Sequence, residues 1–141
     1  MKKLFLTVLV FVMLISVSFS VFAAEDKPAA KVIAYYFRGA ARCPTCHKLE
    51  QYSKEAVENN FKEALRSGRL EFKVVNVEDK GNEHYWNDYQ LYTKSLILSL
   101  VKNDKQIKWK NLDKIWEYVG NKQRFIDYVQ SGVADLLKEI Q

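Results

Sequence analysis

Six apolar or aromatic residues in a row, Val32–Phe37, are followed after a short loop by Cys43-Pro44-Thr45-Cys46, where a helical pattern begins. Such a run is typical of a strand that is buried on both faces of a sheet. Pro44 suits the first turn of a helix, where the N–H that proline lacks has no partner within the helix. The sequence therefore predicts a strand–loop–helix unit with two cysteines at the start of the helix.

Cys43 and Cys46 are the only two cysteines in the 141-residue chain. A disulfide across two intervening residues closes almost no loop, so it stabilises a fold very little. The partial positive charge at a helix N-terminus favours the thiolate, and we therefore predict a redox-active pair. Arg38, Arg42 and protonated His47 would add positive charge and are predicted to tune the Cys43 thiolate. The alternative is that these three residues are solvated and have no special role.

Because residue 47 is histidine, Cys43–His47 also matches the attachment motif of c-type haem. A second axial ligand would have to be His84, since Met1 and Met13 both lie in the predicted export signal. Zinc bound by the two cysteines and two histidines is a further alternative, although adjacent helical residues such as Cys46 and His47 point in different directions. The reduced pair could also bind a soft ion such as copper or trivalent arsenic.

The N-terminus has the pattern of an export signal. Lys2-Lys3 precede the apolar stretch Leu4–Ile15, and Val21 and Ala23 occupy the positions that the signal peptidase prefers to be small. Residues 1–23 are predicted to be a signal peptide cleaved after Ala23, which makes the protein periplasmic or bound to the cell surface. The alternative is an uncleaved anchor, because the 19 uncharged residues 4–22 could just span a bilayer. We expect membrane contact only in that case.

Residues 24–31 are predicted to be a flexible lead-in, and residues 32–141 a single domain. Cleavage of the signal would lower the formal net charge from +5 to +3, with basic and acidic residues interleaved along the predicted helices. This small excess, together with export, argues against nucleic-acid binding. The sequence has no flavin, nicotinamide or phosphate-binding glycine motif, and we expect no cofactor besides the cysteine pair.

Hydrophobic periodicity predicts alternating strands and helices along the rest of the chain. The predicted strands are Val32–Phe37, Leu70–Val77, Ser95–Val101 and Gln106–Trp109, and the predicted helices run from Pro44 to a stop at Ser67-Gly68, from Asn82 to Tyr92, from Leu112 to Val119 and from Gln123 to Ile140. Helices between the early strands predict parallel pairing there, whereas the Asn103-Asp104 turn predicts an antiparallel hairpin at the edge. The predicted α/β fold has the order β-α-β-α-β-β-α, with a four-stranded mixed sheet and helices on both faces. The cysteines would lie at the C-terminal end of the first strand, where open α/β sheets place their sites.

This order of elements, and the position of the cysteine pair within it, resemble the thioredoxin superfamily over nearly all of Val32–Ile140. The resemblance implies a thiol–disulfide oxidoreductase that exchanges two electrons with a partner protein. In such proteins the first cysteine is the exposed nucleophile and the second resolves the mixed disulfide. By resemblance, Cys43 attacks and Cys46 resolves.

A closer resemblance is to the exported ArsF-type family, whose small thioredoxin-like members are known as subunits of a nitrophenyl-compound nitroreductase. Four segments carry it: Tyr36–Gly39, Ala41–Cys46, Val75–Glu78 and Asp88–Ser95. The resemblance implies a subunit that relays electrons by dithiol exchange, with a membrane-embedded electron donor as a partner, while another subunit handles the aromatic substrate.

Three positions depart from the thioredoxin pattern. Arg42 stands where a tryptophan usually precedes the first cysteine, and Phe37 stands where a buried acid usually accepts a proton. Lys94, after Thr93, stands where a cis-proline usually faces the disulfide. A cis bond before a residue other than proline costs about 2.5–4 kcal/mol, so we expect Thr93–Lys94 to be trans and its backbone to face a docked partner. With no acid predicted nearby, the pKa of Cys43 is predicted to lie well below that of a free thiol.

Overall fold

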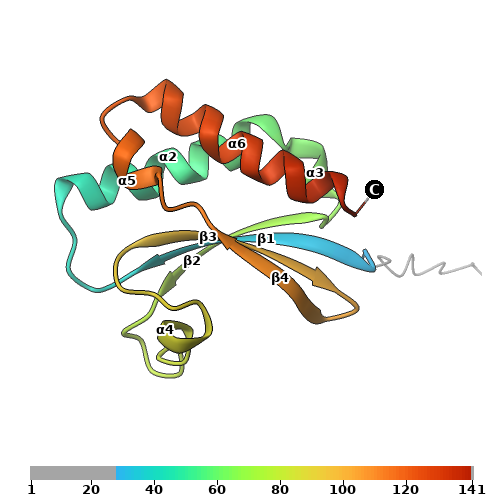
Figure 1. Ribbon diagram of the computed structural model, residues 1–141, viewed down its shortest axis with the longest axis horizontal. Helices are drawn as coiled ribbons and strands as arrows, with labels where there is room; N and C mark the ends of the chain where they lie inside the picture. Colours follow the sequence, from blue (N-terminus) through green and yellow to red (C-terminus); the bar gives the residue numbers. More distant parts are fainter. Residues whose placement is uncertain (1–27, 141) are drawn as a thin grey trace, which may run out of the picture.

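The computed structural model describes residues 28–140. The predicted signal peptide, residues 1–23, lies outside the described residues, as does the first half of the predicted lead-in, residues 24–27. The elements follow in the order β1 (Ala30–Arg38), α2 (Pro44–Asn60), α3 (Lys62–Arg66), β2 (Leu70–Asn76), α4 (Tyr85–Asp88), β3 (Ser95–Lys102), β4 (Lys105–Asn111), α5 (Ile115–Tyr118) and α6 (Lys122–Lys138) (Figure 1). Within this described part, no helix combines the length and the apolar character needed to cross a membrane.

The four strands form one mixed sheet in the order β2-β1-β3-β4. β1 runs parallel to β2 and antiparallel to β3, and β3 and β4 form an antiparallel hairpin. The predicted four-stranded mixed sheet is therefore confirmed, and this arrangement of strands and helices is thioredoxin-like.

Parallel pairing of the early strands is confirmed for β1 and β2 but is wrong for β3. β2 ends at Asn76 beside Arg38, and β3 begins at Ser95 beside Phe37, at the same end of the sheet. The intervening residues 77–94 contain only the single-turn helix α4, which is too short to carry the chain back along the sheet. The chain therefore re-enters the sheet in the opposite direction.

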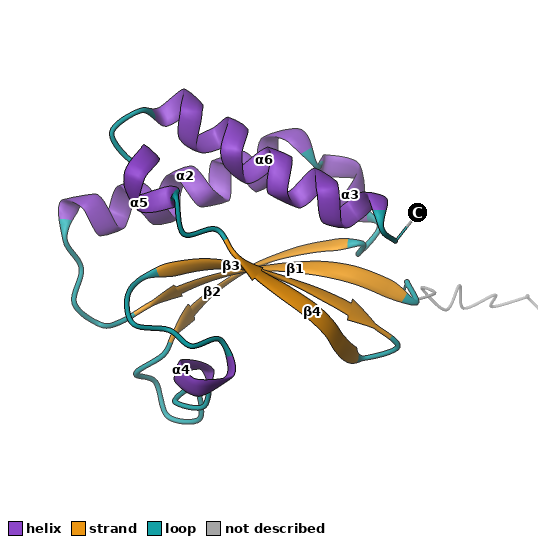
Figure 2. Ribbon diagram, in the orientation of Figure 1, coloured by secondary structure: helices purple, strands orange, loops and turns teal. Residues whose placement is uncertain are grey.

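The helices lie on both faces of the sheet, as predicted, but unequally. α2, α3, α5 and α6 cover one face, and the segment that contains α4 lies on the other (Figure 2). β1 supplies both cores: Val32, Ala34 and Tyr36 belong to the large core under the helices, whereas Phe37 belongs to the smaller core on the α4 side. The predicted burial of this strand on both faces is thus confirmed.

Helix α2 begins at Pro44, as predicted, with Cys43 as its N-cap. Its buried positions recur every three or four residues, at Cys46, Leu49, Ser53, Ala56 and Val57. The single helix predicted as far as Ser67-Gly68 is interrupted at Phe61, whose backbone leaves the helical region at φ −120° and ψ 33°. Gly68 ends the second piece, α3, with a positive φ of 71° that suits glycine.

The starts of β1 and α4 differ from the prediction, whereas the turn between β3 and β4 lies where it was predicted. β1 begins at Ala30, inside the predicted lead-in. α4 begins at Tyr85 and not near Asn82, because the Asn82 amide donates a hydrogen bond to the Asn76 carbonyl at 2.9 Å and does not cap the helix. Asn103 and Asp104 both have positive φ, 50° and 59°, which confirms the predicted hairpin turn.

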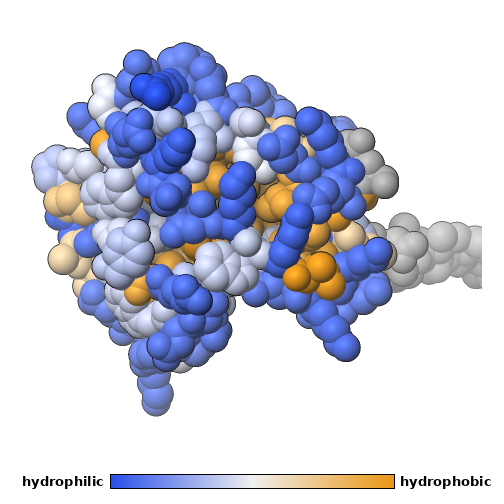
Figure 3. Space-filling view, viewed as in Figure 1, coloured by the Kyte–Doolittle hydropathy of each residue, from blue (hydrophilic) through white to orange (hydrophobic). Residues whose placement is uncertain are grey.

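β4 forms one edge of the sheet, and Lys105, Lys108 and Lys110 are exposed along it. Lys108 reaches the C-cap of α6, where its Nζ lies 2.6 Å from the Glu139 carboxylate. Figure 3 shows hydrophobic surface in a band between α6 and β4. A pocket of about 340 Å³ lies there, and buried Gly132 of α6 forms part of its wall.

Helix α6 approaches the sheet closely at Gly132. A Cβ atom on this residue would lie 3.0 Å from Leu112 Cδ2 and 3.3 Å from Leu98 Cδ1. Contacts this short require the leucine side chains to move, so a larger residue would overpack the core.

We predict that Gly132→Val lowers the free energy of unfolding by about 1–3 kcal/mol, the usual cost of overpacking. Valine forms helices better than glycine, so helix propensity alone would raise stability instead. Urea unfolding monitored by circular dichroism measures the change. Ser131→Val, at the exposed neighbouring position, is the matched control, and equal stability of the two variants would contradict the close approach.

Aromatic rings fill the smaller core on the α4 side of the sheet. The Tyr35 and Phe37 rings stack at 5.4 Å, Tyr85 lies 5.0 Å from Phe37, and Trp109 packs edge-on against Tyr89 at 5.5 Å. Burial, and to a lesser extent the neighbouring phenols, raise the pKa of Tyr35 to about 12. The folded protein therefore holds this phenol neutral above the pH at which the unfolded chain releases its proton.

We predict a loss of stability between pH 10 and about 12 to which Tyr35 contributes. Below pH 10 both states keep the proton, but between pH 10 and 12 the unfolded state binds fewer protons, so stability falls as pH rises. Tyr35→Phe should make this fall shallower in urea-unfolding measurements across the range. Tyr92→Phe, which changes an exposed phenol, is the control, and equal slopes in the two variants would contradict the prediction.

Candidate redox site

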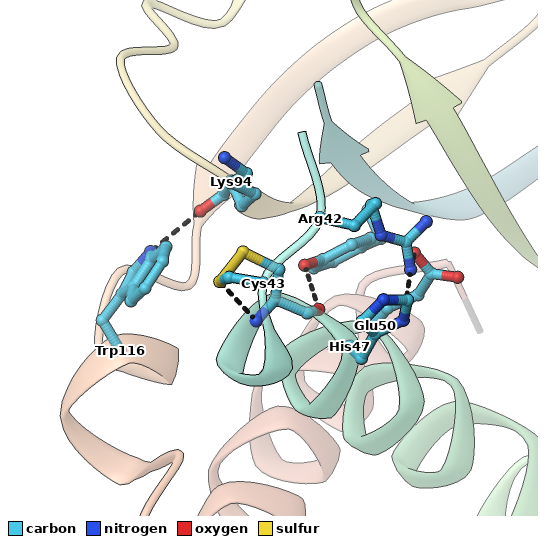
Figure 4. Close-up of a disulfide and its surroundings, with 8 residues drawn as sticks. Arg42, Cys43, His47, Glu50, Lys94 and Trp116 are labelled. Carbon is cyan, nitrogen blue, oxygen red and sulfur yellow. Dashed lines mark hydrogen bonds and ion pairs between the residues drawn. A yellow bond between two sulfur atoms is a disulfide. The ribbon is translucent and has the colours of Figure 1, made fainter. Parts of the chain in front are cut away.

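Cys43 and Cys46 form a disulfide at the first turn of α2, with Cα atoms 4.9 Å apart. The backbone N–H of Cys46 donates a hydrogen bond to the Cys43 sulfur at 3.1 Å (Figure 4). Cys43 is exposed, whereas Cys46 is only 4% exposed. A partner can therefore reach the first sulfur but not the second, which fits an attacking Cys43 and a resolving Cys46.

The helix N-terminus favours a charged sulfur at Cys43. The N–H of Cys46 that contacts this sulfur in the disulfide would donate to a thiolate after reduction. The aligned peptide dipoles of α2 add partial positive charge at the same position. A thiolate stabilised in this way is the form that attacks a disulfide.

Tyr36 ties the first turn of the helix to the central strand. Its buried hydroxyl donates a hydrogen bond to the Cys46 carbonyl at 3.1 Å. Burial, reinforced by the nearby Glu50 carboxylate, raises the pKa of Tyr36 well above the ordinary value, although Arg42 and Arg38 act in the opposite direction. The phenol therefore stays protonated and keeps donating this bond.

The two arginines predicted to tune the thiolate contact an acid. Arg42 Nη2 lies 2.9 Å from Glu50 Oε2, and Arg38 Nε lies 4.0 Å from the same oxygen. Figure 4 shows Arg42 directed toward Glu50 and His47, whose Nδ1 is 3.1 Å from Arg42 Nη2. Because a guanidinium only donates, His47 Nδ1 is the acceptor in this contact.

The predicted facing loop is also present at this end of the sheet. Every peptide bond within residues 28–140 is trans, so the predicted trans bond between Thr93 and Lys94 is confirmed. The Lys94 carbonyl accepts a hydrogen bond from the indole N–H of Trp116, in α5, at 2.9 Å. Figure 4 shows Lys94 and Trp116 on one side of the disulfide and Glu50 on the other.

A small pocket of about 130 Å³ opens beside the facing loop. It is lined by Phe37, Arg38, Gly39, Val77, Glu78, Trp86, Leu91, Tyr92, Thr93 and Lys94. Sites that enclose a small-molecule ligand usually measure about 300–1,000 Å³. The disulfide sulfurs do not line this pocket, so the chemistry of the site lies on the open surface beside it.

The structure does not bring His84 to the cysteines. His84 precedes α4, across the sheet from α2 (Figure 1), and its Nδ1 lies 2.9 Å from the Gly81 carbonyl. Between residues 28 and 140, no group of three or more histidine, cysteine or acidic side chains is placed to hold a metal ion. His84 therefore cannot join Cys43 and His47 in the arrangement that was predicted as an alternative.

Sequence reasoning missed two residues of the site. Glu50 follows Cys46 by four positions in α2, and this spacing places both side chains on the same side of a helix. The spacing was a usable signal. Trp116 has no such signal, because only the fold brings α5 next to the facing loop.

We predict that Trp116→Phe loosens the facing loop without unfolding the protein. The change keeps an aromatic ring but removes the donor to the Lys94 carbonyl, a bond worth about 1 kcal/mol. Backbone amide hydrogen exchange in residues 93–95 should become about fivefold faster, as expected for a local opening that is easier by that amount. Trp109→Phe, at a half-buried tryptophan of β4 that does not line the pocket beside the loop, is the control, and equal exchange rates in the two variants would show that the hydrogen bond does not hold the loop.

Two solved thioredoxin structures are similar to this chain, both at low sequence identity. No family model matches the chain, and no curated protein matches it. Thioredoxin from Fasciola hepatica is 19% identical with a TM-score of 0.38, and covers 65% of this chain and 81% of its own. Thioredoxin f2 from Chlamydomonas reinhardtii is 15% identical with a TM-score of 0.35, and covers 70% and 82%. At such low similarity the fold is assigned from its own strand order, and the chain has a thioredoxin-like fold with a Cys-X-X-Cys disulfide at the C-terminal end of β1.

Proposed function

We propose that this protein is an exported thiol–disulfide oxidoreductase that exchanges two electrons with a partner protein through Cys43 and Cys46. The observation that carries the proposal is the asymmetry of the disulfide: the Cys43 sulfur caps a helix and is exposed, whereas Cys46 is buried beneath it. An asymmetric pair can form a mixed disulfide with a partner through one sulfur and release the partner with the other.

The proposed reaction balances without any further reagent. The Cys43 thiolate attacks a partner disulfide, forms a mixed disulfide and displaces one partner thiolate, which takes up a proton. Cys46 then loses its proton and attacks the Cys43 sulfur, which forms the Cys43–Cys46 disulfide and displaces the second partner thiolate. Two electrons pass to the partner. The Cys46 proton goes to the second displaced thiolate, and the first thiolate takes its proton from water, which replaces the proton that Cys43 had released. The reverse sequence oxidises a partner dithiol.

The surface near the disulfide supports a protein as the partner. Three of the large exposed hydrophobic side chains lie at this end of the sheet: Tyr92 is 81% exposed, Trp116 38% and Trp86 36%. Trp86 and Tyr92 border the pocket beside Lys94, and Trp116 contacts the Lys94 carbonyl. Aromatic residues are enriched where proteins bind one another.

The position of His84 favours exchange over the haem alternative. Haem attached through Cys43–His47 would need His84 as its second axial ligand, and His84 precedes α4 on the other face of the sheet from α2. Capture of copper or trivalent arsenic would use the same two sulfurs after reduction, so it would compete with exchange at this site.

The proposed role in the cell follows the resemblance to the ArsF-type family. We place the protein in the periplasm or at the cell surface, as the electron-transfer subunit of a nitrophenyl-compound reductase, with a membrane-embedded donor. The stretch Asp88–Ser95, which is specific to that resemblance, includes the facing loop at Thr93 and Lys94. In this role the dithiol relays electrons and another subunit binds the aromatic compound.

We predict that reduced Cys46→Ala protein, incubated with oxidised glutathione, accumulates a stable mixed disulfide at Cys43. Mass spectrometry of the full chain should detect one added glutathionyl group. Wild-type protein should instead pass through this species and end as the Cys43–Cys46 disulfide, because Cys46 displaces glutathione.

Cys43→Ala is the matched control, since its one remaining thiol is buried and should react slowly. Rapid modification of Cys46 in this variant, or no mixed disulfide in the Cys46 variant, would overturn the proposed function. Equilibration of the wild type with glutathione then gives the direction of electron flow: a potential near about −270 mV indicates a reductant, and one near about −120 mV an oxidant.

A further inference from the structure

Two arginines near the start of α2 converge on one carboxylate. Glu50 Oε2 lies 2.9 Å from Arg42 Nη2 and 4.0 Å from Arg38 Nε. All three side chains are about three-quarters buried, with exposed fractions of 25% to 28%. Arg42, which directly precedes Cys43, and Arg38, at the end of β1, therefore share one anion.

We propose that Glu50 sets the reactivity of Cys43 by neutralising Arg38 and Arg42, and so makes the disulfide a weaker oxidant than the two arginines alone would make it. This inference rests on the thiol–disulfide exchange proposed above. It assigns Glu50 as a positioning and charge-balancing residue, which acts on the sulfur through the arginines.

The surroundings of Glu50 leave it few other roles. Its Oε2 atom is buried and has no aligned hydrogen bond within the described residues, so the guanidinium groups are what stabilise its charge. The Tyr36 hydroxyl, on β1, donates to the Cys46 carbonyl. His47, on the same helix as Glu50, contacts Arg42 through Nδ1. The charged and titratable groups around the carboxylate are thus two arginines, a phenol and the His47 imidazole.

The sign of the effect follows from electrostatics. A positive charge close to a thiol lowers its pKa, and partial exposure to solvent reduces this effect. Arg42 directly precedes Cys43 in the chain. Glu50 cancels part of the positive charge that would otherwise stabilise a thiolate at Cys43. Without Glu50, the thiolate of the reduced protein becomes more stable. Because the disulfide is uncharged, the oxidised protein changes little, and the pair becomes more oxidising.

The test is Glu50→Gln in the full-length chain. The rate of Cys43 alkylation against pH should show a thiol pKa about one unit lower than in the wild type. At a pH above this pKa in both proteins, equilibration with glutathione should favour the reduced protein about tenfold more, equal to a potential higher by about 30 mV. An unchanged or higher pKa, or an unchanged potential, would overturn the inference.

Two further comparisons separate charge balance from a structural role. Glu58→Gln changes an acid on the same helix that pairs with Lys54 at 3.8 Å, and it should leave both quantities as in the wild type. In a background that carries Arg38→Gln and Arg42→Gln, adding Glu50→Gln should no longer lower the pKa. A shift of the same size in that background would refute the inference.

If Glu50→Gln fails to fold, the variant that carries Arg38→Gln and Arg42→Gln still tests the inference. It should raise the pKa of Cys43, and an unchanged pKa would contradict the inference.

The wild-type protein distinguishes this inference from the proposed function. If the wild type does not equilibrate with glutathione at all, the proposed function fails. If the wild type equilibrates and the Glu50 variant matches it, only the role of Glu50 fails.

Discussion

The hydrogen bond from the Cys46 N–H to the Cys43 sulfur defines the first turn of α2, and the rest of the site is arranged around that turn. β1 cannot shift beneath it, because the strand is paired on both sides and buried on both faces. The Tyr36 hydroxyl then joins the strand to the Cys46 carbonyl. With the helix start held in this way, one sulfur has to face solvent and the other has to face the core. The difference in accessibility between the two sulfurs is therefore a property of the junction between strand and helix.

Much of this fold could be predicted from local patterns. The apolar run Val32–Phe37 indicated the central strand, and Pro44 indicated where the helix after it begins. The direction of β3 could not be predicted in the same way, because it depends on how far residues 77–94 travel along the sheet and not on their helical character. The break at Phe61 was hidden for a related reason: residues on both sides of it pack on the same core, so the hydrophobic spacing continues across the interruption.

The site was predictable to a similar degree. Its sulfur chemistry follows from the spacing of Cys43 and Cys46, and the nearby arginines follow from their positions in the chain. Their charge balance does not, because the contact between Arg42 and Glu50 forms only when the loop before α2 and the helix itself are folded. The indole beside the disulfide comes from Trp116 and not from the residue before Cys43, and only tertiary packing places it there. Sequence patterns thus identify the reactive atoms more readily than the groups that adjust them.

The exposed lysines of β4 have a consequence for how molecules of this protein meet. An unpaired strand edge is a template onto which another strand can add, and repeated addition leads to fibrils. A second copy that paired edge to edge with β4 would bring its own row of ammonium groups against Lys105, Lys108 and Lys110. Repulsion between these ammonium groups, to which Lys108 adds less because Glu139 pairs with it, opposes the addition of a second copy at the β4 edge.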